Sequence, residues 1–219
     1  MTTATLTEWA YPLAESLLAS PLPRRWKHSL GVAERARAIA AIFGPDAELL
    51  EAAAVLHDVG YSPDLAKTGF HPLDGARHLQ SVGADERVAR LVAHHSCAWM
   101  EADARGLRDE LEGEFPREKE HLADALCFCD MNTTPDGTPT NPLDRINEIT
   151  GRYGPDSLMH GCATLLFAAG VAPRVVMEIL GHSQIAVTMN IYTHVTDGSR
   201  REAMGKMDHL LQRRPPSRK

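Results

Sequence analysis

Histidine and aspartate residues recur in this sequence where their side chains could bind a transition metal ion. Seven of the eleven histidines fall between positions 28 and 121 of the 219-residue chain. The candidate ligands are His28, His57, Asp58, His71, His94, His95 and Asp130. Imidazole nitrogen together with carboxylate oxygen suits Fe, Mn, Co or Zn, whereas a site of oxygen ligands alone suits Mg or Ca. These residue types therefore predict a site for one or two divalent transition metal ions.

The surroundings of the two aspartates favour the same interpretation. Asp58 and Asp130 each lie within an apolar run, at 52–59 and 125–131. A buried carboxylate without a partner is costly, and metal coordination is a common remedy. Because adjacent residues on a helix point about 100° apart, His57 and Asp58 need further ligands from other helices. A helical bundle supplies them, since its facing helices project side chains into one core.

The elements that must position these ligands are helices. Apolar residues at helical spacing, separated by proline and glycine, are the basis of the prediction. The expected helices are 6–18, 24–43, 46–59, 73–81, 85–100, 101–113, 117–131 and a short one at 142–153. Gly60 is expected to end the third of them as its left-handed C-terminal residue. Strand-like alternation is missing from the sequence, so the predicted fold class is all-α.

Five segments within residues 1–155 resemble the HD superfamily of metal-dependent phosphohydrolases. The segments are 24–33, 54–60, 71–76, 92–96 and 123–130, and their ligands follow the superfamily order H…HD…H…H…D. The resemblance implies an all-α HD-domain bundle over residues 1–155 that hydrolyses a phosphate ester or anhydride. Its substrate would be a small phosphorylated molecule such as a nucleotide.

The resemblance also implies a role for each candidate residue. One metal ion would be held by His28, His57, Asp58 and Asp130. Asp58, the candidate catalytic residue, would bridge to a second ion held by His71 and His95, with His94 beside them. Metal ions in such a site lower the pKa of bound water and offset charge on the phosphoryl oxygens. The candidates for binding the substrate phosphate, because they lie near these motifs, are Lys67, Arg24 and Arg25.

The motifs leave the substrate and even the reaction open. The pattern also resembles HD-type diadenosine tetraphosphate hydrolases and, at His71 and His94-His95, the HD-GYP phosphodiesterases. The GYP signature is absent after His95, and Tyr61 stands where HD nucleotidases often have an acid. Mixed-valent di-iron oxygenases of the superfamily share the same ligand order, so an oxygenase is the alternative function.

The C-terminal segment, residues 156–219, has a different character. Its segments 162–166, 173–176, 179–183 and 187–194 resemble the end of a tyrosine recombinase or phage integrase catalytic domain. By that resemblance Tyr192 matches the nucleophile and His182 an active-site histidine. The His-x-x-Arg motif of the family falls on 156–159, where Asp156 and Met159 replace both functional residues. The fragment is therefore catalytically incomplete, and recombinase activity is not expected.

Charge and hydropathy restrict the partners. Residues 156–219 carry 8 Lys and Arg against 5 Asp and Glu, a net charge of +3, so the rest of a chain whose overall charge is −6 carries −9. The acidic body disfavours binding of nucleic acid, and the basic tail is the segment that could favour it. DNA association through the tail is therefore a third hypothesis. The apolar residues of the tail, which is predicted helical at 158–169, 173–180, 184–192 and 197–211, need a partner surface. We expect that surface to be the HD-like domain or a second copy of the chain, and the second option would make a homodimer. Without a signal-type N-terminus or an apolar run of roughly 20 residues, we expect a cytoplasmic protein that does not cross a membrane.

Overall fold

A computed structural model of the chain describes residues 5–141, 144–145 and 148–149. The chain divides into two units between Ile149 and Thr150, and the described residues belong to the first. The predicted tail helices, together with His182 and Tyr192, lie outside the described residues. The domain boundary expected at 155 stays a prediction.

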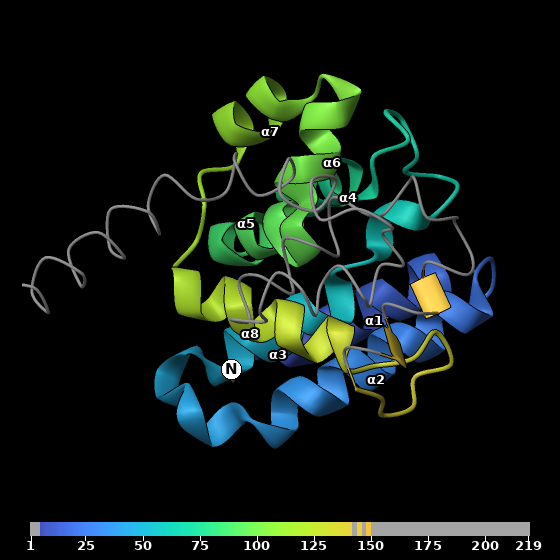
Figure 1. The fold of residues 1–219 in the computed structure, drawn as a ribbon, viewed down its shortest axis with the longest axis vertical. Helices are drawn as coiled ribbons and strands as arrows, with labels where there is room; N and C mark the ends of the chain where they lie inside the picture. Colours follow the sequence, from blue (N-terminus) through green and yellow to red (C-terminus); the bar gives the residue numbers. More distant parts are fainter. Residues whose placement is uncertain (1–4, 142–143, 146–147, 150–219) are drawn as a thin grey trace, which may run out of the picture. The chain divides into compact units, whose positions relative to one another are not determined.

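The described part of the chain is all-α, which confirms the predicted fold class (Figure 1). Its α-helices are α1 (Leu6–Leu18), α2 (Pro23–Ala38), α3 (Ala47–Leu56), α4 (His71–Ser81), α5 (Glu86–His94), α6 (Ala98–Arg105), α7 (Arg108–Glu114) and α8 (Glu120–Met131). Four 3-10 turns connect some of them: η1 (Ala40–Ile42), η2 (Gly44–Asp46), η3 (Val59–Tyr61) and η4 (His95–Cys97). Across these residues, β pairing is limited to an isolated bridge between Thr133 and Pro139.

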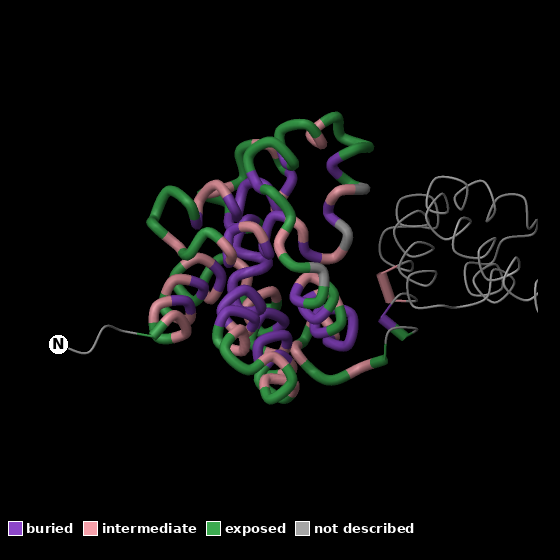
Figure 2. Tube along the Cα trace, turned by 90° about the vertical axis from the view of Figure 1, so that its left-hand side faces the viewer, coloured by how far each residue is buried: buried purple, intermediate pink, exposed green. Residues whose placement is uncertain are grey.

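Helix α3 is the centre of this unit. It packs against α1, α2, α5 and α8. Figure 2 shows buried residues gathered in the interior of the described part of the chain. Every residue of α3 from Ala52 to Leu56 is fully buried. A helix that is apolar on all sides in this way belongs in a core rather than at a surface. No helix in the described ranges combines the length and apolar character needed to span a bilayer.

Three helices end earlier than the apolar pattern predicts. Helix α2 ends at Ala38, because Ile39 leaves helical geometry at φ −102° and ψ 5°, and the chain then passes through η1 and η2. Helix α3 ends at Leu56, so His57 is its C-cap residue and Asp58 has left the helix at φ −103° and ψ 5°. The expected helix 85–100 is interrupted after His94 by η4. Two of these three breaks therefore fall at predicted metal ligands.

The expected role of Gly60 as a left-handed helix terminator is wrong. Gly60 does not have a positive φ, and it lies inside η3. A Cβ atom on Gly60 would sit 1.9 Å from the carbonyl oxygen of His71 and 2.6 Å from the backbone nitrogen of Gly75. Glycine is required because the backbones of η3 and α4 approach each other more closely than any side chain permits. This contact brings the chain segment of Asp58 onto the start of α4.

We expect Gly60→Ala to lower the free energy of unfolding by at least about 2 kcal/mol, because the backbone of α4 cannot move aside cheaply. Gly113→Ala is the matched control. Gly113 lies in α7 with nothing within 4 Å of an added Cβ, so alanine should stabilise by up to about 1 kcal/mol. Urea unfolding of the full chain and both variants measures the difference. Equal midpoints for the two variants would contradict the close-approach argument.

Candidate metal centre

Side chains from six separate elements meet in the interior of the unit. They are His28 of α2, His57 at the end of α3, Asp58 before η3, His71 at the start of α4, His95 of η4 and Asp130 of α8. Five of these six are buried, with His71 at the boundary to solvent. Titratable groups are rarely buried together without an ion or a hydrogen-bond network to offset the cost. The cluster is therefore the leading candidate for a functional site.

One half of the cluster is formed around His28 and Asp130. Nε2 of His28 lies 3.0 Å from Oδ1 of Asp130 and 3.9 Å from Oδ2 of Asp58. Nε2 of His57 lies 3.3 Å from the same Oδ2. Potential ligand atoms of His28, His57 and Asp130 all lie within 4.8 Å of one another. Two ligand atoms about 2.1 Å from one ion are separated by roughly 3 Å, so these spacings fit a single shared ion.

The other half is formed around His71 and His95. Their Nε2 atoms are 3.1 Å apart. They lie 3.5 Å and 3.9 Å, respectively, from Oδ1 of Asp58. The two carboxylate oxygens of Asp58 thus face different pairs of imidazoles. His57, Asp58 and His95 also converge within 4.8 Å, so His57 has access to both halves. The carboxylate of Asp58 thus lies between two groups of imidazoles.

Backbone carbonyls orient three of the imidazoles. Nδ1 of His28 bonds the carbonyl oxygen of Thr134 at 3.0 Å, Nδ1 of His57 bonds Ala54 at 2.7 Å, and Nδ1 of His95 bonds Val92 at 2.6 Å. A ring whose Nδ1–H donates in this way, when neutral, presents the lone pair of Nε2 to the cluster. Nε2 of His57 is fully buried and forms no hydrogen bond of regular geometry, although Oδ2 of Asp58 lies 3.3 Å away. Such an inward-facing, unsatisfied nitrogen fits a metal ion.

The electrostatics of the cluster differ from one histidine to the next. Burial lowers the pKa of His71 and of His95, so both imidazoles are neutral and able to act as ligands. Burial also disfavours the charged form of His57, but the carboxylates of Asp58 and Asp130 outweigh it and raise the pKa of His57 to about 9. The pKa of Asp58 is well below its usual range, because His57 and Arg25 offset the effect of burial.

The structure does not bring His94 into this cluster. Its Nε2 instead donates to the carbonyl oxygen of Phe115 at 2.6 Å. His94 is the last residue of α5, and the chain turns directly after it, so only His95 is directed to Asp58. The predicted neighbouring role of His94 in metal binding has no support in this geometry.

The three predicted phosphate-binding residues have different surroundings. Arg25 is close to the cluster, with Nη1 2.7 Å from Oδ2 of Asp58 and a side chain that is 24% exposed. Its guanidinium carbon lies 3.8 Å from the ring centre of Tyr61. Arg24 is 62% exposed and forms a surface ion pair with Asp136 at 2.9 Å. Lys67 lies on the loop before α4, where its side chain is exposed and its backbone N–H bonds Asp74. Arg25 alone among the three contacts a predicted metal ligand.

Two residues that the sequence did not single out as functional support the cluster directly. The hydroxyl of Ser96 donates to Oδ2 of Asp130. Tyr61 stacks on His71, with ring centres 3.8 Å apart and an angle of 18° between the rings. The position of Tyr61, three residues after Asp58, was a signal in the sequence. Ser96 gave no signal in the sequence beyond its place after His95, because its role depends on the backbone conformation.

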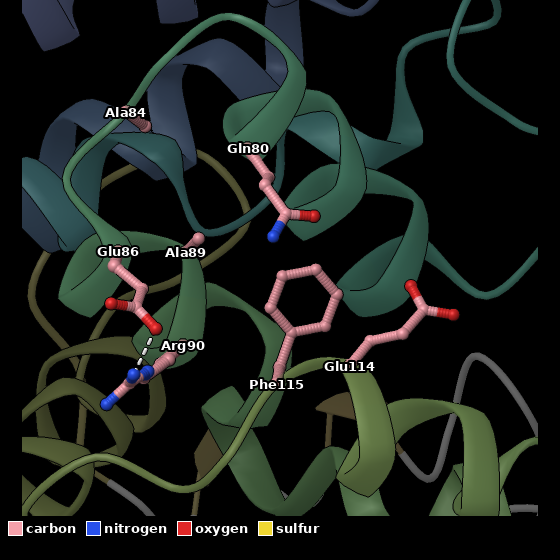
Figure 3. A pocket seen from close by; sticks show the side chains of 7 residues that line it. All are labelled: Gln80, Ala84, Glu86, Ala89, Arg90, Glu114 and Phe115. Carbon is pink, nitrogen blue, oxygen red and sulfur yellow. Dashed lines mark hydrogen bonds and ion pairs between the residues drawn. The ribbon is translucent and has the colours of Figure 1, made fainter.

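A separate hollow lies between α4, α5 and the end of α7 (Figure 3). It has a volume of about 230 Å³, and the labelled side chains of Gln80 and Phe115 point into it. Glu86 and Arg90 on its rim pair with each other, as the dashed line shows. None of the residues lining this hollow belongs to the metal-ligand cluster.

Two protein families match the chain, as the motifs predicted. The HD domain family matches residues 25–131, and the phage integrase family matches residues 117–199. The HD match contains all six residues of the cluster. The two matches overlap at residues 117–131, which include the whole of α8. Both resemblances are thereby confirmed, although the integrase match begins earlier than the predicted boundary.

Individual relatives reflect the same division. Ribonuclease Y of Thermus thermophilus is 28% identical over 190 residues, which cover 80% of this chain and 32% of that protein. A tyrosine recombinase XerC-like protein of Caldanaerobacter subterraneus subsp. tengcongensis is 43% identical over 77 residues, 33% of this chain and 20% of that protein. Tyrosine recombinase XerD of Corynebacterium glutamicum is 50% identical over 48 residues, 22% of this chain and 16% of that protein. The chain spans about a third or less of these relatives. No solved structure matches it significantly.

The raised pKa of His57 predicts how metal affinity depends on pH. Below about pH 9 the metal-free protein carries a proton on Nε2 of His57, which an incoming ion must displace. We expect the affinity for Zn²⁺ to rise by up to about tenfold per pH unit between pH 7 and pH 9. Competition with a chelator of known affinity at each pH measures it, with His94→Gln as a control that should behave like the wild type. An affinity that stays constant over this range would contradict the role of His57.

Proposed function

We propose that this chain, whose residues 25–131 form an HD domain, is a metal-dependent phosphohydrolase that acts on a phosphate ester or anhydride of a nucleotide or similar small molecule. The observation that carries the proposal is the convergence of four imidazoles on the two buried carboxylates. Matches to the HD domain family and to Ribonuclease Y support it.

The ligand set is suited to transition metals. His28, His57 and Asp130 would hold a first ion, and His71 and His95 a second, with Asp58 between them. Divalent Fe, Mn, Co or Zn bound there would polarise a phosphoryl oxygen and make water acidic enough to react near neutral pH. The protein itself fixes the donor atoms: Nδ1 of three histidines is tied to carbonyls, which leaves their Nε2 atoms pointing inward. The burial of these groups keeps bulk water away from the ligands.

Arg25 is the residue best placed to bind the substrate phosphate. Its guanidinium contacts Asp58 from the partly exposed side of the cluster, where a phosphoryl group would approach. A guanidinium presents several N–H donors in one plane, which suits two phosphoryl oxygens at once. Tyr61 lies against this guanidinium and against His71, so it holds the phosphate-binding group and a predicted metal ligand in fixed relation.

The net negative charge of the chain outside its C-terminal segment favours a small substrate over a long polyanion. The chain outside residues 156–219 carries a net charge of −9, which opposes binding of a long polyanion. The name of Ribonuclease Y indicates a phosphodiester of RNA as the substrate of that relative. We therefore include short phosphodiesters with nucleotides in the proposed substrate class. We propose no recombinase activity, because Asp156 and Met159 replace both functional residues of the His-x-x-Arg motif, and the match covers only about a fifth of a recombinase such as the XerC-like protein.

The proposed function is tested by metal analysis and a substrate screen on the full chain. We expect one or two transition metal ions per chain and hydrolysis of at least one nucleotide, dinucleotide or short oligoribonucleotide. Asp58→Ala should lower turnover by more than roughly 100-fold, beyond the effect of losing a residue that only supports a ligand. Glu101→Gln, which removes a surface carboxylate paired with Arg105, is the control and should keep full activity. Oxygen uptake without phosphate release would instead identify a di-iron oxygenase.

The neighbouring arginines provide a matched pair for the phosphate-binding role. Arg25→Ala should raise KM and lower kcat/KM for the best substrate by roughly 10- to 100-fold, since a charge-assisted contact to phosphate contributes about 1.5–3 kcal/mol. Arg24→Ala should leave both constants unchanged, because its guanidinium pairs with Asp136 at the surface. Steady-state kinetics with each variant decide the matter. Equal losses in the two variants would show that overall charge, rather than the position of Arg25, attracts the substrate.

A further inference from the structure

Ser96 has a backbone conformation that residues with a side chain seldom adopt. Its φ is 48° and its ψ 42°, and no other residue except glycine has a positive φ within the described ranges. The left-handed region is disfavoured for L-residues because Cβ approaches the following carbonyl oxygen. Glycine, and to a lesser degree asparagine, are the usual residues at such positions. Strained residues of this kind concentrate at functional sites, where the surrounding structure enforces them.

The left-handed conformation of Ser96 allows two residues of η4, His95 and Ser96 itself, to face the cluster. Helix α5 ends at His94, and the chain resumes a helical course only at Ala98. Between these points His95 is directed to Asp58, while the hydroxyl of Ser96 reaches Oδ2 of Asp130 on α8. A continuous helix through 85–100 would point His95 and Ser96 about 100° apart, so it could not direct both to the same cluster as easily.

The hydrogen bond from Ser96 gives the two oxygens of the Asp130 carboxylate different partners. Oδ2 accepts from Ser96, and Oδ1 faces Nε2 of His28 at 3.0 Å. The carboxylate is buried, so its orientation is set by these two contacts rather than by water. Oδ1 is therefore left to face Nε2 of His28, at the place where ligand atoms of His28, His57 and Asp130 lie within 4.8 Å of one another.

We propose that Ser96 is a positioning residue of the metal site, which uses a strained backbone to hold the Asp130 carboxylate in the orientation that a metal ion needs. The proposal rests on the metal-dependent function argued above. A residue that only formed the turn would be glycine at lower conformational cost, whereas glycine lacks the hydroxyl that Asp130 accepts from. Ser96 thus combines an unfavourable conformation with a contact to a predicted ligand.

The test compares Ser96→Gly with Ser96→Ala in the full chain, because both lack the hydroxyl and only glycine relieves the strain. Titration with Co²⁺ alone, followed by its visible absorption, measures metal affinity, and urea unfolding without metal measures stability. Both variants should bind Co²⁺ roughly 10- to 100-fold more weakly than the wild type, as expected for loss of a residue that orients a ligand. The glycine variant should unfold at a higher urea concentration than the alanine variant, the reverse of the usual order for these two residues.

The outcomes separate this proposal from the function on which it rests. Wild-type affinity in both variants would mean that Ser96 only forms a turn, and would overturn the proposal while leaving the metal site intact. A more stable alanine variant would show that the backbone is not strained. A wild-type chain that binds no Co²⁺ would overturn the proposed function itself, and the role of Ser96 with it.

Discussion

The burial of Asp58 is the constraint on which the arrangement of this unit depends. A carboxylate in the centre of a helical core is tolerated only with nearby positive charge or metal ions, because desolvation otherwise favours its neutral form. Here the imidazoles of His28, His57, His71 and His95 lie around its two oxygens, and the guanidinium of Arg25 contacts one of them. Five elements besides its own segment supply these partners and Asp130. The packing of these helices therefore also fixes the positions of the groups that surround Asp58.

Local interruptions of helical structure are the means by which the side chains reach Asp58. Adjacent residues of a regular helix point about 100° apart, but α3 ends at Leu56, and Asp58 after the C-cap His57 has left helical geometry. The close approach of Gly60 to the backbone of His71 then brings η3 onto the start of α4. At η4 the left-handed conformation of Ser96 has a comparable effect. In each case the irregular backbone lies between two helices, α3 and α4 at η3, and α5 and α6 at η4.

The two family matches overlap at α8, the helix that carries Asp130. Helix α8 supplies Asp130 and packs against α2, α3 and α5, so it belongs to the core of the first unit. The integrase match nevertheless begins at residue 117, ahead of this helix. Similarity to integrases in this stretch therefore coexists with residues that serve the metal-ligand cluster. In the function proposed above, α8 would serve the metal site through Asp130.

The sequence by itself determined the all-α class, the approximate positions of the helices and the residue types of the cluster. These features are local, because helical periodicity and the metal preference of imidazole and carboxylate groups depend on neighbouring residues and on side-chain chemistry. The tertiary structure decided which of His94 and His95 faces Asp58, which of Arg24 and Arg25 reaches it, and that Ser96 supports Asp130. Each choice depends on where a helix ends and how its backbone turns. Those points are set by contacts between segments distant in the chain, such as Gly60 with His71 and Ser96 with Asp130, which no local pattern encodes.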